Sequence, residues 1–185
     1  YLRSRGMQIA EGSEGPQAGT LTATFRYLVD LDAPSTVVLA RTTTPNTDGE
    51  TGGAFGLFYA GAAKGGGART EALVPGLAQD ETVRSNLAAV NLGGGSELPV
   101  VLEARLYDAD TGAQAGSPVT ATLSPGDWVQ WSRVHALAGA PASVTRFTAV
   151  VRRLWGDDTF LAYGVLNDSV TSDGSFQTMI ASDPY

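Results

Sequence analysis

Cysteine is absent from this 185-residue sequence, while lysine and histidine occur once each, as Lys64 and His135. The absence of cysteine excludes disulfide bonds, thiolate metal ligands and a thiol nucleophile. A single histidine excludes zinc sites that need two or three imidazoles, and it leaves one residue to act as the base of a serine hydrolase. We expect His135 to lie at the surface, where it caps a turn at the end of a strand.

The sequence also lacks an excess of positive charge and a long apolar run. It has 19 acidic and 12 basic residues, which gives a net charge of −7. This charge repels phosphate backbones, so we expect no nucleic-acid partner. No stretch of about 18 apolar residues occurs, so we expect no membrane insertion. The chain begins at Tyr1 without a signal-peptide pattern, which we interpret as a processed chain or a segment of a longer exported protein.

Glycine and strand-forming residues dominate what remains. The sequence has 23 glycines and 43% hydrophobic residues, a composition that favours a folded protein of strands and turns. The clearest alternation of apolar and polar residues is at residues 20–29. Further strands are expected at residues 35–44, 54–60, 69–74, 83–91, 98–107, 117–123, 128–134, 143–154, 160–167 and 175–180.

Turn residues separate these runs, and helix is nearly absent. Only residues 75–80 and 135–139 are expected to form single helical turns. The glycine triplets at 65–67 and 93–95 are predicted to be hairpin loops.

Regularly spaced strands with turns between them are typical of an antiparallel sandwich. We therefore predict an all-β fold: an antiparallel β-sandwich, Ig-like in the broad sense, with about 10 strands and minimal helix. Residues 20–185 are predicted to form this single domain. Residues 1–19 lack periodicity and are predicted to be either an irregular N-terminal leader or a strand exchanged with a neighbouring molecule.

The sequence contains no complete set of catalytic residues. A nucleophile elbow requires Gly-x-Ser-x-Gly, and the nearest stretch, residues 94–98, lacks the final glycine. A glycosidase requires two carboxylates facing each other across a sugar, but the acidic residues fall mostly in loops. Glu103 lies within a predicted strand, where we expect it to face solvent beside Arg105 or a cross-strand arginine. We predict no catalytic residue and no enzyme activity.

One loop offers oxygen ligands at alternate positions. Asn46, Asp48 and Glu50 could together hold calcium, which binds through carboxylate and amide oxygens. The loop is not an EF-hand, because its glycine is misplaced and no bidentate glutamate follows at the required distance. We expect the protein to fold without any cofactor, with calcium at these three residues as the alternative.

Three tryptophans, Trp128, Trp131 and Trp155, could form a platform on which sugar rings stack. In an extended strand Trp128 and Gln130 share one face, while Trp131 lies on the other. If one face of this strand is exposed to solvent, at most one of Trp128 and Trp131 is deeply buried. The competing interpretation is that these rings pack in the core or at its rim.

Polar residues interrupt the apolar run at 83–91. Arg84, Asn86 and Asn91 lie among valine, leucine and alanine, and buried polar groups must be paired. We predict that these three residues form structural hydrogen bonds rather than a ligand site.

The order of several segments resembles an uncharacterised bacterial secreted or cell-surface β-sandwich (Ig-like) module found in large exported proteins. The first half of this resemblance comprises residues 41–44, 53–58 and 83–91. The second half comprises residues 104–112, 123–126, 129–134 and 162–168. The resemblance implies an exported, modular and non-catalytic protein.

We therefore predict a non-catalytic exported structural or adhesive module of a bacterial surface or extracellular protein, capable of self-assembly. Its expected partners are other domains of the same precursor or copies of itself. The alternative is a carbohydrate-binding module that holds polysaccharide through exposed tryptophans. A fold does not determine a function, so this prediction depends on the resemblance and on the missing catalytic groups.

Overall fold

The computed structural model of the chain describes residues 23, 38–45, 54–62, 66–94, 96–171 and 174–182. Within them it contains eleven strands and one short helix, which confirms the predicted all-β fold. The elements are β1 (Leu39–Pro45), β2 (Ala54–Ala60), β3 (Glu71–Ala78), β4 (Val83–Gly93), β5 (Val100–Asp108), β6 (Gln114–Leu123), β7 (Trp128–Trp131), α1 (Val134–Leu137), β8 (Arg146–Trp155), β9 (Thr159–Asp168), β10 (Gly174–Thr178) and β11 (Ile180–Ala181).

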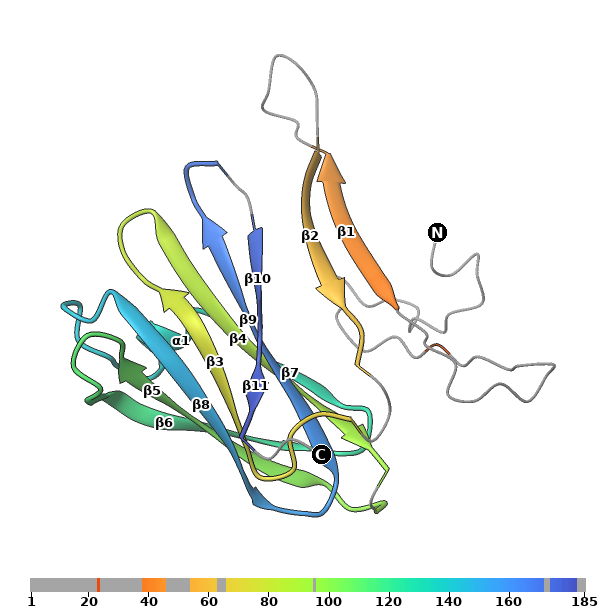
Figure 1. Ribbon diagram of the computed structural model, residues 1–185. Helices are drawn as coiled ribbons and strands as arrows, with labels where there is room; N and C mark the ends of the chain where they lie inside the picture. The colour runs from red at the N-terminus through yellow and green to blue at the C-terminus, as the bar shows by residue number, and fades with distance from the viewer. Residues whose placement is uncertain are drawn as a thin grey trace, which may run out of the picture.

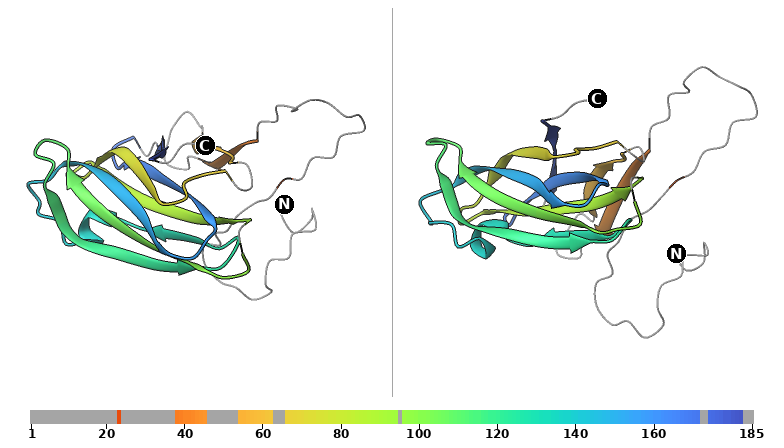
Figure 2. Two further views of the ribbon diagram at one scale, coloured as in Figure 1. Left: turned by 60° about the horizontal axis from the view of Figure 1, so that its bottom comes forward. Right: turned by 90° about the horizontal axis from the view of Figure 1, so that it is seen from below.

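The strands form two packed antiparallel sheets and a separate hairpin. One sheet has the order β10-β9-β4-β7, and the other has the order β11-β3-β8-β5-β6. Figure 2 shows these sheets as two stacked layers. Strands β1 and β2 pair only with each other among the described residues, and their hairpin lies beside β10 (Figure 1).

The core lies between the two sheets because each sheet turns one apolar face inward. On β5, Val100, Leu102, Ala104 and Leu106 alternate with more exposed residues, and all four are at most 1% exposed. The facing strands add further buried side chains, including Phe147 on β8 and Phe160 on β9. Burial of such side chains contributes roughly 1.5–3 kcal/mol each to folding.

Strand β4 is buried on both of its faces from Ser85 to Asn91. Leu87 and Ala89 belong to the core between the sheets. Ala88 and Val90 point to the opposite face, which we call the outer face of the four-stranded sheet. Burial at these outer positions shows that larger side chains from neighbouring strands cover them.

The predicted helical turn at residues 75–80 is wrong. Residues 71–78 form β3, and the register of its pairing with β8 shifts between Val74 and Leu77. Pro75 has no N–H to donate, and Gly76 adopts a positive φ of 75°, so this pair forms a bulge within the strand. The other expected turn, at residues 135–139, is present as α1 with slightly earlier bounds.

The glycine triplets do not form the predicted hairpin loops. The first lies between β2 and β3, and the second begins at Gly93, the last residue of β4, and leads toward β5; in each case the two strands belong to different sheets. Gly67 shows why a glycine is needed at such a crossing. It has a φ of 98°, and a Cβ atom there would lie 2.5 Å from the carbonyl oxygen of Phe160.

Residues 1–19 and the predicted strand at residues 20–29, apart from Ala23, lie outside the described residues. In the part of the chain that the structure does describe, no helix is long and apolar enough to cross a membrane.

Candidate functional site

Four aromatic side chains meet on the outer face of the four-stranded sheet. Tyr59, Trp128, Tyr163 and Phe176 come from β2, β7, β9 and β10, and we call them the outer aromatic cluster. The rings of Tyr163 and Phe176 are 5.1 Å apart at an angle of 34°. Tyr59 meets both rings edge-on, at 6.2 Å from Tyr163 and 5.6 Å from Phe176. The cluster is therefore packed ring against ring, an arrangement that favours cohesion over an open stacking platform.

Strand register explains why these rings converge. Tyr163 pairs with Ala88 across β9 and β4, and Phe176 pairs with Val165 across β10 and β9. Ala88 is small, so it leaves space above the sheet between Tyr163 and the side chains of β7. Trp128 occupies this side, and its Nε1–H donates a hydrogen bond to Tyr163 Oη at 2.8 Å.

The phenol of Tyr163 is a poor acid in this position. Burial raises its pKa because it disfavours the phenolate, and the hydrogen bond from Trp128 offsets only part of this effect. Tyr163 therefore stays neutral at physiological pH and acts as a hydrogen-bond acceptor for the indole. The cluster can bind apolar or aromatic groups, but its described members do not form an acid–base pair.

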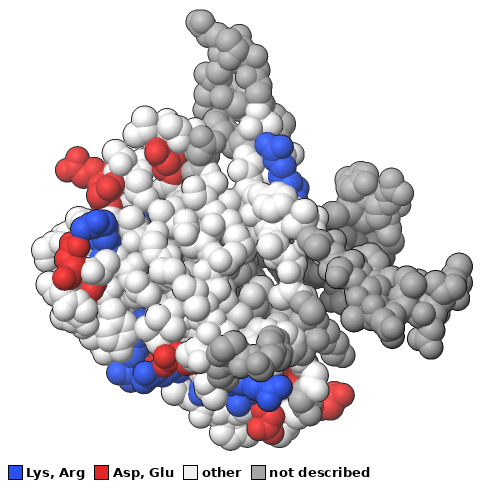
Figure 3. Space-filling model, viewed as in Figure 1, with Lys and Arg blue, Asp and Glu red and all other residues white. Residues whose placement is uncertain are grey.

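The β1–β2 hairpin docks on this cluster through one face of β2. Leu57 and Tyr59 point toward the sheet, and we call Tyr163, Gly174 and Phe176 the hairpin seat. A Cβ atom built on Gly174 would lie 3.1 Å from Leu57 Cδ1, so the missing side chain at Gly174 makes room for Leu57. Figure 3 shows charged side chains mainly toward the rim of this view, with an uncharged middle around β10.

The opposite face of the hairpin is apolar as well, and it is exposed. Phe58 is 51% exposed and Leu39 is 57% exposed. Arg41 pairs directly with Phe58 across the hairpin and lies on the same face. The hairpin thus carries apolar side chains on both faces, and the described residues cover only part of one face, at Leu57 and Tyr59.

The three tryptophans proposed as a sugar platform lie in three different environments. Trp131 is 5% exposed and belongs to the core, whereas Trp128 is half-buried in the outer aromatic cluster. Trp155 is 52% exposed at the end of β8, in the other sheet. Alternation along the strand correctly predicted that Trp128 and Trp131 differ in burial. The structure does not bring the three indoles together.

The predicted polar residues of β4 bind main-chain groups at two separate places. On the outer face, Asn86 Oδ1 accepts a hydrogen bond from the N–H of Arg133 at 2.8 Å. On the inner face, Asn91 Nδ2 donates to the carbonyl oxygen of Leu123 at 3.0 Å. Arg84 is half-buried on the same face as Asn86. Asn86 therefore connects β4 to the turn after β7, and Asn91 connects it to the end of β6, so the two asparagines do not share one network.

His135 is buried rather than at the surface as predicted. It is 6% exposed, and its ring lies 5.5 Å from the ring of Phe147. The left-handed turn at Arg133 directs α1 inward, and no local pattern predicts this turn because arginine is uncommon in that conformation. The lone histidine thus packs in the interior.

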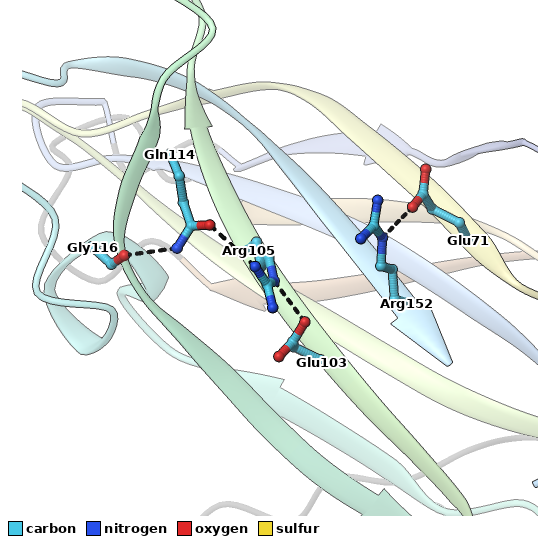
Figure 4. Close-up of polar contacts among 6 residues, drawn as sticks. All are labelled: Glu71, Glu103, Arg105, Gln114, Gly116 and Arg152. Carbon is cyan, nitrogen blue, oxygen red and sulfur yellow. Dashed lines mark hydrogen bonds and ion pairs between the residues drawn. The ribbon is translucent and has the colours of Figure 1, made fainter. Parts of the chain in front are cut away.

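Ion pairs lie on the outer face of the five-stranded sheet (Figure 4). Arg152 pairs with Glu71, and Arg105 pairs with Glu103 at 2.6 Å. The bond to Glu103 raises the pKa of the Arg105 guanidinium. Arg105 also donates to Gln114 at 3.3 Å, so this row links β3 to β8 and β5 to β6. Glu103 lies beside Arg105, as expected, but its side chain is only 12% exposed and does not face open solvent.

The proposed calcium ligands Asn46, Asp48 and Glu50 lie outside the described residues. Elsewhere in the chain, the ranges that the structure describes contain no group of three His, Cys, Asp or Glu residues that could hold a metal ion.

Comparison with known proteins gave no significant match to any protein-family model, curated protein or solved structure. The similarity to bacterial surface modules therefore stays a prediction from the sequence segments.

Proposed function

We propose that this chain is a non-catalytic structural or adhesive module of an exported bacterial protein, and that it acts by associating with copies of itself. The observation on which the proposal rests is the β1–β2 hairpin, which is apolar on both faces. One face is docked through Leu57 and Tyr59, and the other exposes Leu39 and Phe58. Exposed apolar residues gathered on one element are typical of an interaction surface.

The buried polar side chains support a structural role, because most of them bind the main chain of another segment. Ser85 Oγ donates to the carbonyl oxygen of Ala78 at 2.8 Å, and Asp158 Oδ1 accepts from the N–H of Ser96 at 2.9 Å. Asn86 and Asn91 act in the same way. These hydrogen bonds hold strands and loops in place. The exported location rests on the resemblance of the sequence segments.

A carbohydrate-binding module is the second candidate, and Trp155 favours it. Its indole is 52% exposed beside Leu154, which is 55% exposed. An exposed tryptophan can stack on a sugar ring. This candidate requires one indole to hold the ligand, since the other two tryptophans are packed elsewhere.

Capture on beads separates the two candidates. The full chain is coupled to beads, and labelled full chain is added with and without an excess of unlabelled chain. We expect saturable capture that the unlabelled chain competes away. Capture no greater than on beads carrying an unrelated protein would overturn the proposal.

The same labelled chain is tested for retention on insoluble polysaccharides, with Trp155→Ala and the neighbouring Leu154→Ala as matched variants. We expect no retention of any of the three proteins. Retention that Trp155→Ala abolishes and Leu154→Ala preserves would establish the carbohydrate-binding candidate instead.

A further inference from the structure

The hairpin is joined to the sandwich by side-chain contacts. Among the described residues, the main-chain hydrogen bonds of β1 and β2 stay within the hairpin, including the bond from Gly61 N–H to the carbonyl oxygen of Val38. The contacts with the seat are those of Tyr59 with two rings and of Leu57 with Gly174. No strand ladder between described residues has to break when the hairpin leaves its seat.

The connection to the sandwich is short and rich in glycine. Gly61 is bonded to Val38 within the hairpin, and Gly67 packs against the carbonyl oxygen of Phe160, next to Ala68, which forms a β-bridge with Phe160. Residues 62–66 lie between these two positions, and two of the five are glycine. Glycine restricts the backbone least, and five extended residues reach about 17 Å. The hairpin can therefore reach a surface of a second molecule that lies close to its own sandwich.

Two copies could associate through the exposed face of the hairpin or by transfer of the hairpin from one copy to the other. The size of the exposed face bears on this choice. The face that carries Phe58 consists of only four positions on each strand: 39, 41, 43 and 45 on β1 and 54, 56, 58 and 60 on β2. A stable interface uses about 20–30 residues from each partner. This face is therefore smaller than a whole stable interface, and transfer of the hairpin adds contacts that are already complementary.

We propose that the β1–β2 hairpin is exchanged between copies of this chain, so that Leu57 and Tyr59 of one molecule occupy the seat formed by Tyr163, Gly174 and Phe176 of another. This inference depends on the proposed self-association and specifies its contact. Exchange replaces each intramolecular contact by an identical intermolecular one. The free energy of exchange is therefore set mainly by chain concentration and by the connecting residues.

The absence of cysteine allows a direct test. The Cβ atom of Leu57 lies 3.8 Å from an ideal Cβ atom on Gly174, which is the mean separation in a disulfide bond. The full chain is prepared as two single variants, Leu57→Cys and Gly174→Cys. They are mixed at increasing concentration and oxidised, and the peptides linked through positions 57 and 174 are quantified by mass spectrometry. In this mixture the link can form only between two molecules.

We expect the intermolecular link to appear and to increase with concentration. The matched control replaces Leu57→Cys by Phe58→Cys, whose side chain lies on the other face of the same strand, and it should give at least tenfold less linked peptide with Gly174→Cys. The double variant Leu57→Cys/Gly174→Cys should form the link within one molecule at low concentration.

A link in the double variant without any link in the mixture would overturn the exchange, because the hairpin would then stay on its own sandwich. Failure of both to link would overturn it too, because the hairpin would not occupy the seat at all. If chains are captured on beads while the mixture stays unlinked, the proposed function stands and the exchange alone is wrong.

Discussion

Asn86 on β4 accepts a hydrogen bond from the main-chain N–H of Arg133. Among the described residues other than glycine, Arg133 alone has a positive φ, of 50°. A left-handed conformation costs an ordinary residue roughly 1–2 kcal/mol. The bond from Asn86 holds this conformation where the chain turns from β7 into α1. Val134 and His135 follow directly and are buried. One side chain on a central strand thus fixes the turn that places the helix.

Asn86→Ala should lower the free energy of unfolding by roughly 1–3 kcal/mol, because the N–H of Arg133 loses a partly buried acceptor. Urea unfolding followed by fluorescence measures this loss. Ser132→Ala, at an exposed position in the same turn, should change stability by less than about 0.5 kcal/mol. Equal losses in the two variants would show that the Asn86 bond does not hold the turn.

The three tryptophans should respond to truncation in the order of their burial. Trp131→Ala removes a core side chain and should cost roughly 3–5 kcal/mol. Trp155→Ala should cost less than about 0.5 kcal/mol because its side chain is largely exposed. Trp128→Ala should fall between them, since it removes a half-buried ring and the hydrogen bond to Tyr163. A large loss for Trp155→Ala would contradict the placement of β8.

The sequence predicts features that depend on local alternation, and it fails where distant segments determine the structure. Alternation separated Trp128 from Trp131 and placed Glu103 on the face of β5 that points away from the core. It could not place Tyr59 beside Tyr163, because that contact depends on how a separate hairpin docks on a sheet. The bulge at Pro75 and Gly76 was mistaken for a helical turn, since both residues are common in turns and in bulges.

A side chain at Gly164 would overpack the core, since a Cβ atom there would overlap Cδ2 of the buried Leu77. Gly164→Ala should therefore cost roughly 1–3 kcal/mol through overpacking of the core. The same substitution in a Leu77→Ala background should cost at least 0.5 kcal/mol less, because the contacting atom is gone. Thermal melts of the four proteins of this cycle measure the coupling. Additive effects would rule out the contact.

Three turn carboxylates should make stability depend on acid pH. Main-chain hydrogen bonds from Thr82 to Asp80, from Asp110 to Asp108 and from Thr171 to Asp168 lower the pKa of each carboxyl below its ordinary value of 3.8. The unfolded chain then binds more protons than the folded chain below that value, so stability rises with pH there.

The contribution of these carboxylates should be fully present above pH 3.8 and should decline as the pH falls through their lowered pKa values. Urea midpoints measured from pH 6 downward test this expectation. Asp80→Asn keeps an acceptor oxygen but cannot titrate, so the variant should lose less stability on acidification than the wild-type chain does. Identical acid dependence in both proteins would show that Asp80 does not contribute.

Sedimentation equilibrium of the full chain across a wide range of concentration tests the proposed self-association most directly. The mean mass should rise from that of one chain toward that of two chains or more as concentration increases, and it should fall back on dilution. Trp155→Ala should give the same curve, because that indole lies on β8, in the other sheet from the hairpin seat. A mass of one chain at every concentration would contradict the account.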